Sequence, residues 1–210
     1  METKFFIIRH GQSIGNAWNR YLGHTDLGLS ELGHVQAKET AEALAEQKID
    51  LIYSSDLKRA HETAIPNAKI RGIDIIDSKE LREMYVGDWE GRAVSDLKKL
   101  YYKEFVLDWL GDFGNFTFPN GENVLHAADR FYNEVKRIAD LNPGKTIMIT
   151  SHAAIIRAFW CKISGVAPDD MAKAFPFPGN ASYSTLSYDG EKFIPIQYSV
   201  DDHIKTKSTL

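Results

Sequence analysis

The sequence predicts an α/β protein in three layers (α/β/α), with a mostly parallel sheet and helices on both of its faces. Short apolar segments alternate with longer segments of helical composition, as in strands joined by crossover helices. Several apolar segments are continuous, which is typical of strands buried on both faces. With 43% hydrophobic and 26% charged residues, the chain can bury a sizeable core. We expect residues 1–210 to form a single domain.

In the first part of the chain we expect three strands, at 5–8, 51–53 and 73–76. The third alternates apolar and polar residues and is therefore expected nearer the edge of the sheet. A helix rich in Ala, Glu and Lys follows Ser30, which is suited to cap it. Asp56 is suited to cap the next helix, and Pro66 is expected to end it.

In the second part, apolar spacing predicts helices over 93–110 and 122–141, separated by a loop rich in Gly, Phe and Asn. The strand at 146–150 is the clearest in the chain and leads directly into another helix. Two last strands, at 182–188 and 192–199, flank Asp189-Gly190, a hairpin turn signal.

Polar residues follow three of the predicted strands. Arg9-His10 follow the first, Ser54-Ser55 the second, and Ser151-His152 the strand at 146–150. Ligands of parallel α/β sheets bind outside the carboxyl ends of the strands. We therefore expect these side chains to form one site.

Four residues make this site suitable for phosphate: Arg9, His10, Arg59 and His152. Arginine presents a planar, permanently charged fork that matches phosphate, and a neutral imidazole can attack phosphorus. Gly11 would let backbone N–H groups approach the anion. Arg59 lies in the first turn of its predicted helix and can reach back over the strand end. The residues indicate an anion pocket that needs no metal.

Each of these residues also has an ordinary structural explanation. Arg9 and His10 could belong to the surface, Arg59 to a solvated helix face, and His152 to the core. The other histidines receive the structural interpretation, except His24, which stays open because its loop follows the first site segment. Neither a metal nor another cofactor is expected, since the chain has no His-x-x-x-His or Cys-x-x-Cys spacing.

Several motifs, in order along residues 9 to about 157, resemble the histidine phosphatase superfamily, which includes cofactor-dependent phosphoglycerate mutase. They are Arg9-His10-Gly11 with Ser13 and Asn16, SSDLKRAHET at 54–63, LREMYVGDWEG at 81–91, PNGE at 119–122 with Arg130, and Thr150-Ser151-His152. Two departures are small: Ala153 replaces a Gly common in the family, and Asn123 replaces a Ser. Neither removes a charged group.

The resemblance implies a role for each site residue. His10 would be the nucleophile that becomes phosphorylated. The phosphoryl oxygens would be held by Arg9, Arg59 and His152, with a neutral hydrogen bond from Asn16. Ser13 and Gly23 are further candidate substrate contacts.

Glu83 would be the general acid that protonates the leaving alkoxide and then the base that activates water. An alkoxide is a poor leaving group, so the chemistry itself requires a proton donor. The structural alternative for Glu83 is a loop carboxylate that is paired locally.

The expected activity is hydrolysis of a phosphate monoester through phosphohistidine. The segment between Glu83 and Pro119 is short compared with mutase members, which favours a phosphatase similar to the bacterial broad-specificity and α-ribazole phosphatases. A mutase-type phosphotransferase and a catalytically silent phosphate-binding module remain alternatives. The substrate-facing rim is expected to contain Trp18, Tyr21, Tyr85, Trp89 and parts of 101–118, unless these aromatic residues only pack the loops.

Bulk properties restrict the partners. The net charge of −4 gives no indication of binding to nucleic acid or membranes, and the expected partner is a small phosphorylated metabolite. Cys161 is the single cysteine, which favours a reducing, cytoplasmic compartment. The short apolar run after the N-terminus is too short for a signal peptide. The oligomeric state, including a homo-oligomer, is left open.

Overall fold

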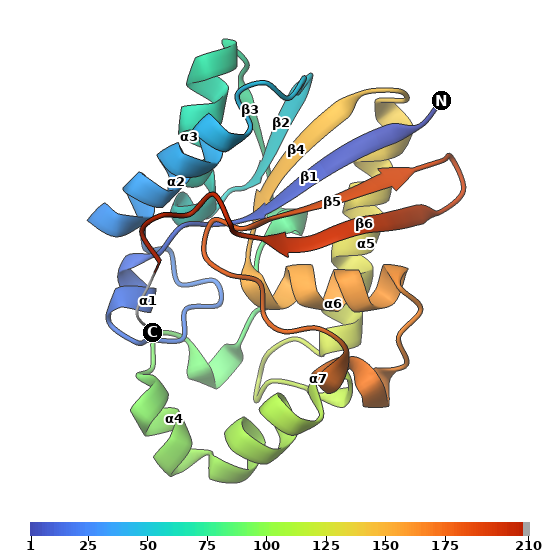
Figure 1. The fold of residues 1–210 in the computed structure, drawn as a ribbon. Helices are drawn as coiled ribbons and strands as arrows, with labels where there is room; N and C mark the ends of the chain where they lie inside the picture. Colours follow the sequence, from blue (N-terminus) through green and yellow to red (C-terminus); the bar gives the residue numbers. More distant parts are fainter. Residues whose placement is uncertain (208–210) are drawn as a thin grey trace.

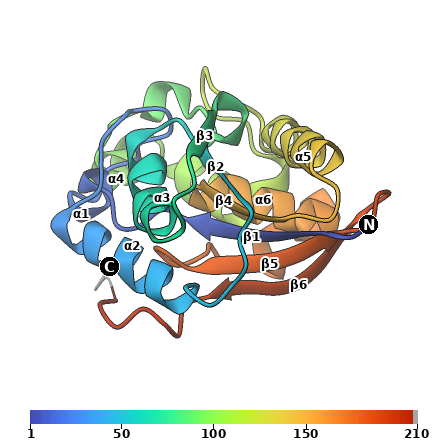
Figure 2. The ribbon, with the colours of Figure 1, turned by 90° about the horizontal axis from the view of Figure 1, so that it is seen from above.

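The computed structural model describes residues 1–207 and has the predicted three-layer α/β/α architecture (Figures 1 and 2). Its sheet has the order β3-β2-β4-β1-β5-β6. The strands are β1 (Thr3–Arg9), β2 (Leu51–Ser55), β3 (Ile75–Ser78), β4 (Thr146–Ser151), β5 (Tyr183–Tyr188) and β6 (Phe193–Val200). The first four are parallel to one another, and the β5–β6 hairpin joins β1 antiparallel. As predicted, β3 lies at an edge.

The helices are α1 (Ile14–Ala17), α2 (Glu31–Ala43), α3 (Lys58–Arg71), α4 (Val94–Leu100), α5 (Val124–Leu141), α6 (Ala153–Ile163) and α7 (Met171–Ala174). A π-helix spans Lys103–Trp109, and short 3₁₀ turns lie at Lys79–Leu81, Gly87–Trp89, Phe113–Asn115 and Pro168–Asp170. None of the described helices is long and apolar enough to cross a membrane.

Alternate side chains of β1 enter two different cores. Phe5 and Ile7 belong to the larger cluster, which includes buried residues of α5 and α6. Ile8 belongs to the smaller one, together with Leu44 after α2 and Ala64 of α3. The continuous apolar run is therefore explained by burial on both faces, and Figure 2 shows the two helix pairs on opposite sides of the sheet.

Two predicted caps are confirmed. The Ser30 hydroxyl accepts the Gly33 N–H at 3.1 Å at the start of α2. The Asn123 side chain accepts the N–H groups of Leu125 and His126 at the start of α5. The Asn at 123 therefore still caps the helix, where the family has Ser.

The predicted limits of α3 are wrong at both ends. Asp56 does not cap it: its carboxylate binds Arg82 in two bonds of 2.6 Å. The Lys58 N–H is instead capped at 2.8 Å by Asp26, from a distant loop. Pro66 lies inside the helix, where burial of the flanking helix face offsets the lost backbone bond. The helix ends at Gly72, whose φ of 63° is left-handed.

The single helix predicted over 93–110 is also interrupted. Tyr101, with φ −130° and ψ 43°, ends α4, and the π-helix follows. Phe105 and Trp109 enter the core, whereas Leu100 and Leu110, which belonged to the predicted apolar set, are exposed. The wider π turns bring two large aromatic side chains to one face, which a regular 3.6-residue period does not anticipate.

Candidate active site

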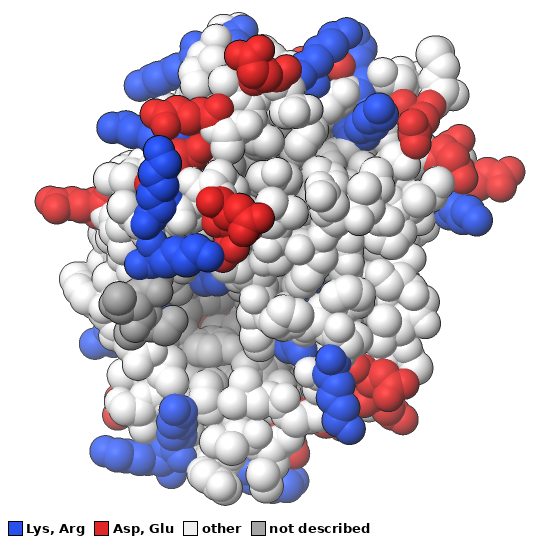
Figure 3. Space-filling model, in the orientation of Figure 1, with Lys and Arg blue, Asp and Glu red and all other residues white. Residues whose placement is uncertain are grey.

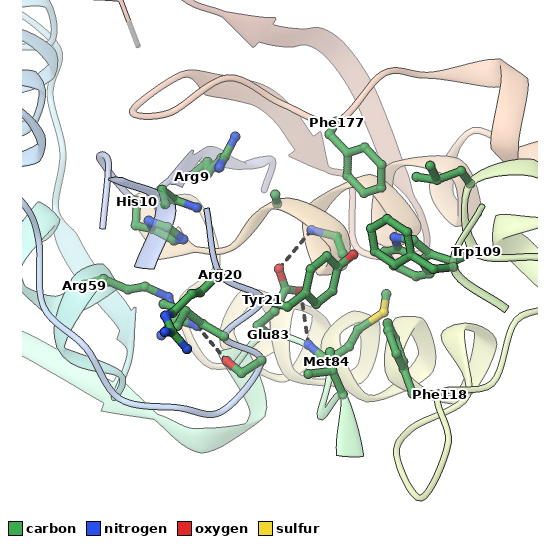
Figure 4. Close-up of a pocket in the computed structure, with 18 residues that line it drawn as sticks. Arg9, His10, Arg20, Tyr21, Arg59, Glu83, Met84, Trp109, Phe118 and Phe177 are labelled. Atoms are coloured by element: carbon green, nitrogen blue, oxygen red, sulfur yellow. Dashed lines mark hydrogen bonds between the residues drawn. The ribbon is translucent and has the colours of Figure 1, made fainter. Parts of the chain in front are cut away.

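The carboxyl ends of β1, β2 and β4 bring the predicted residues together. Arg9 is aligned with Ser151 in the sheet, so His10 and His152 follow adjacent strands. Their imidazole centroids are 5.2 Å apart. Figure 4 shows His10, Arg9, Arg59 and Glu83 around one pocket. The convergence predicted from the strand ends is therefore present.

His10 is held as a neutral imidazole with a defined tautomer. Its Nδ1 lies 2.6 Å from the Gly11 carbonyl oxygen. Because a carbonyl only accepts, Nδ1 carries the proton and Nε2 keeps its lone pair. Burial, and then the charges of Arg59 and Arg9, lower the pKa of His10 well below its usual value. The side chain thus has the protonation state that a nucleophile requires.

His152 has the opposite tautomer. Its Nδ1 accepts a hydrogen bond from Arg59 Nε at 3.2 Å, so Nε2 carries the proton, 2.8 Å from Ser55 Oγ. Burial and the Arg59 charge also lower the pKa of His152 well below its usual value. Both ring nitrogens are bonded to protein groups, so His152 orients Arg59 here, and a direct bond from its ring to phosphate would require Ser55 to release Nε2.

Two guanidinium groups supply the positive charge. Arg59 donates to the carbonyls of Gly23 at 2.7 Å and Thr25 at 3.0 Å, which fixes it over the end of β2. Arg9 donates to the Pro178 carbonyl at 2.6 Å. Burial lowers the pKa of each arginine to about 10, against the opposing charge of Glu83. Both therefore stay charged at neutral pH.

Glu83 enters the same pocket from the loop after β3. Its carboxylate accepts N–H groups from Met84 at 3.0 Å, and from Ala154 and Ile155 at 3.0 and 2.9 Å. Two of these donors belong to the first turn of α6, where the helix dipole also favours a negative charge. The local pairing expected as the structural alternative is thus present, but the carboxylate still lines the pocket.

The backbone of Glu83 is held by residues whose role the motifs alone did not show. His24 Nε2 lies 2.8 Å from the Glu83 carbonyl oxygen, and Arg130 Nη2 donates to the same oxygen at 3.2 Å. Arg130 is in turn paired with Glu122 at 3.0 Å. These contacts position the general-acid loop. Only the placement of His24 in a loop after the first site segment gave a signal.

The smaller candidate residues have different positions. Asn16 lines the pocket, and its Oδ1 accepts the Ser13 N–H at 3.1 Å, so its Nδ2 donors are directed to other partners. Ser13 itself caps α1 and is buried, without lining the pocket. Gly23 lines it and holds Arg59 through its carbonyl.

Gly11 is required for a reason other than the predicted one. Its N–H donates to Thr63 Oγ1 at 3.1 Å and is not directed at an anion. A Cβ at this position would lie 2.5 Å from the Gly33 carbonyl oxygen. The glycine therefore permits close packing of two backbone segments.

The predicted aromatic rim is only partly correct. Tyr21 lines the pocket, as do Phe105, Trp109 and Phe118 from the predicted 101–118 segment. Trp18 and Tyr85 are exposed and do not line it, and Trp89 is wholly buried in the core. Trp89 packs against aromatic rings on several sides, which removes it from the surface.

Within residues 1–207, no group of three or more His, Cys, Asp or Glu side chains could hold a metal ion. The site instead combines a neutral histidine with two arginines and a carboxylate, which is a set suited to phosphoryl transfer. The chain belongs to the histidine phosphatase superfamily, branch 1, whose family model matches residues 5–200.

Similar proteins include phosphatases and mutases. Phosphoserine phosphatase 1 of Hydrogenobacter thermophilus is 29% identical over 96% of this chain and 94% of its own. The 2,3-bisphosphoglycerate-dependent phosphoglycerate mutase of Pseudoalteromonas atlantica is 30% identical over 72% of this chain and 80% of its own. The structure of mycobacterial glucosyl-3-phosphoglycerate phosphatase complexed with VO3 has a TM-score of 0.88 at 27% identity, and covers 94% of this chain and 99% of its own.

Proposed function

We propose that this chain hydrolyses phosphate monoesters through a phosphohistidine at His10, without a metal. The observation that carries the proposal is the state of His10. Its Nδ1 is committed to the Gly11 carbonyl, and burial with two nearby guanidinium groups keeps the ring neutral. The lone pair on Nε2 is then available for attack on a phosphoryl group held by Arg9 and Arg59.

In the first step, His10 Nε2 forms a bond to phosphorus while the bond from phosphorus to the ester oxygen breaks. Glu83 transfers a proton to that oxygen, and the alcohol leaves. In the second step, Glu83 takes a proton from water, the water oxygen bonds to phosphorus, and the N–P bond breaks. Inorganic phosphate and neutral His10 result. Arg9 and Arg59 stabilise the charge on the phosphoryl oxygens in both steps.

A mutase-type phosphotransferase is the second candidate, because one of the similar proteins is a phosphoglycerate mutase. In that case the phosphohistidine would pass its phosphoryl group to a second hydroxyl instead of water. The short segment between Glu83 and Pro119 supports the phosphatase. So do the two similar phosphatases, each matching more than nine-tenths of this chain.

The proposal is tested by acid-stable and base-stable trapping of the phosphoenzyme together with turnover of p-nitrophenyl phosphate in EDTA. His10→Ala is expected to lose both phosphoenzyme and turnover while keeping its fold by circular dichroism. His126→Ala, at an exposed position of α5, is the matched control and should keep both. Near-normal turnover by His10→Ala would show that the nucleophile is misassigned.

The same preparation distinguishes the alternatives. Interconversion of 2- and 3-phosphoglycerate that depends on a bisphosphate primer would identify a mutase. A folded protein that binds inorganic phosphate but turns over no phosphoester would be a binding module. We also propose a small phosphorylated metabolite as substrate, supported by the cavity volume of about 310 Å³, and a cytoplasmic location, supported by the unpaired Cys161.

A further inference from the structure

The active-site pocket has two chemically different ends. The phosphate end contains the residues described above. The other end, here named the apolar chamber, is lined by Tyr21, Leu22, Met84, Val86, Phe105, Trp109, Leu110, Phe118 and Phe177. In Figure 4 the rings of Tyr21, Trp109, Phe118 and Phe177 lie on the side of Glu83 away from Arg9 and His10. A leaving group attached to a phosphate at His10 would extend into this chamber.

The apolar chamber offers little to a second negative charge. Among the described residues that line the pocket outside its phosphate end, Arg20 is the only cation, and it is an exposed residue whose Nη1 donates to the Gly91 carbonyl at 2.7 Å. A carboxylate in the chamber would lose its hydration without gaining a buried partner, which is costly. An apolar group would lose nothing comparable.

A second arginine near the chamber is already fully used. The Arg157 guanidinium lies 4.4 Å from the ring centroids of both Phe113 and Phe177. It donates to three backbone carbonyls, those of Met171, Ala172 and Phe175. Arg157 therefore fixes the segment that carries Phe177 and supports the chamber from behind, without lining the pocket.

The walls of the chamber are also held in place before any ligand arrives. The Trp109 ring lies 4.7 Å from that of Phe118, 5.0 Å from Phe113 and 5.9 Å from Phe177. Trp109 and Phe118 are almost fully buried, and Phe177 and Leu110 are partly exposed at the mouth. A preformed apolar wall binds an apolar group without the entropic cost of ordering itself.

We infer that the preferred substrate is a phosphate monoester whose alcohol is uncharged and apolar, of about the size of one aromatic ring on a short linker. This inference rests on the proposed phosphatase activity. The volume of about 310 Å³ fits it, because an apolar cavity of roughly 150 Å³ already accepts benzene, which leaves room for the phosphoryl group.

The inference is tested with primary alkyl phosphates, whose leaving groups need similar help from Glu83. 2-Phenylethyl phosphate, ethyl phosphate and O-phosphoserine are compared by kcat/KM. We expect 2-phenylethyl phosphate to exceed both others by roughly tenfold or more, from burial of its ring and from the missing partner for the phosphoserine carboxylate. Hydrolysis of all three with phosphoserine preferred would overturn this inference and leave the proposed function intact.

A matched pair of variants ties the preference to the chamber. Leu110→Arg places a cation in the lining at a partly exposed position and should lower the ratio of 2-phenylethyl phosphate to phosphoserine kcat/KM by roughly tenfold. Leu107→Arg adds the same charge on the same π-helix, at an exposed residue outside the lining, and should leave the ratio within about twofold. Equal changes in both variants would overturn the inference. Absence of turnover with any ester, p-nitrophenyl phosphate included, would overturn the proposed function itself.

Discussion

His10 and His152 show how neighbouring groups give the same side chain two different functions. His10 meets a carbonyl at Nδ1, so its Nε2 lone pair stays available. His152 meets the Arg59 N–H at Nδ1 and the Ser55 hydroxyl at Nε2, so both nitrogens are occupied. Only His10 can attack phosphorus without breaking an existing bond. The distinction depends on single hydrogen-bond partners and not on burial, because both rings are buried.

A prediction at this scale concerns Glu83 as the proton donor. Glu83→Gln removes the transferable proton but keeps an oxygen acceptor for the N–H groups of α6. Its kcat for alkyl phosphates should fall by about 10²–10⁴, the usual contribution of a general acid. With p-nitrophenyl phosphate, whose leaving group scarcely needs a proton, the loss should stay well below that range. Steady-state kinetics on both ester classes measure the difference.

Glu191→Gln, at an exposed position in the β5–β6 turn, is the control and should change neither rate. If Glu83→Gln lost the same factor with alkyl and aryl esters, the carboxylate would act by orienting the α6 terminus and not by transferring a proton.

At the scale of elements, the site depends on how the loop before α2 is joined to the start of α3. Asp26 caps the first N–H of α3, and the next residue, Arg59, donates to the carbonyls of Gly23 and Thr25. The loop therefore fixes both the helix terminus and the guanidinium that faces the phosphate. A change in the cap should affect stability first and catalysis only through the position of Arg59.

Asp26→Ala is accordingly expected to lower the free energy of unfolding by about 1 kcal/mol, the usual cost of removing a side-chain cap. Asp26→Asn keeps the oxygen acceptor and should lose only a few tenths of this. The nearby Lys58 ion pair, at 3.8 Å and largely exposed, contributes little. Urea unfolding of the three proteins measures the effect. An Asn variant as unstable as the Ala variant would show that charge, and not the hydrogen bond, matters.

The elements also show which features the sequence could predict. Strands and their order of polar ends follow from local patterns, as in Phe5–Ile8 before Arg9-His10, and these were sufficient to bring the site residues together. The cap from Asp26 and the aromatic contacts that bury Trp89 join distant segments, so no local pattern reveals them. Pro66 and the π-helix at Lys103–Trp109 deviate from local preference because tertiary packing compensates.

At the scale of the whole molecule, the modest net charge places the attraction of an anion in the pocket and not on the surface. On the face drawn in Figure 3, basic and acidic side chains are interspersed around a largely uncharged centre. The two cations of the phosphate end are held under this surface by backbone carbonyls. Substrate recognition should therefore respond to ionic strength much less than a surface charge cluster would.

The two neutral histidines also make the stability of the whole protein depend on pH. Burial lowers the folded pKa of His10 and His152 well below the unfolded value near 6.5. Above pH 6.5 both states bind no proton at these rings, and the full stability is present. As the pH falls below 6.5, the unfolded chain binds protons that the folded protein does not. The free energy of unfolding then falls, by up to about 1.4 kcal/mol per pH unit for each histidine.

Urea unfolding between pH 7 and pH 5 should show this slope, and His10→Gln should reduce it by up to the contribution of one proton, because its side chain does not titrate. His126→Gln replaces an exposed histidine and should leave the slope unchanged. A slope that is the same in His10→Gln as in the unmodified protein would mean that the ring at position 10 is protonated in the fold. Since a protonated imidazole has no lone pair on Nε2, that result would also remove the nucleophile from the proposed reaction.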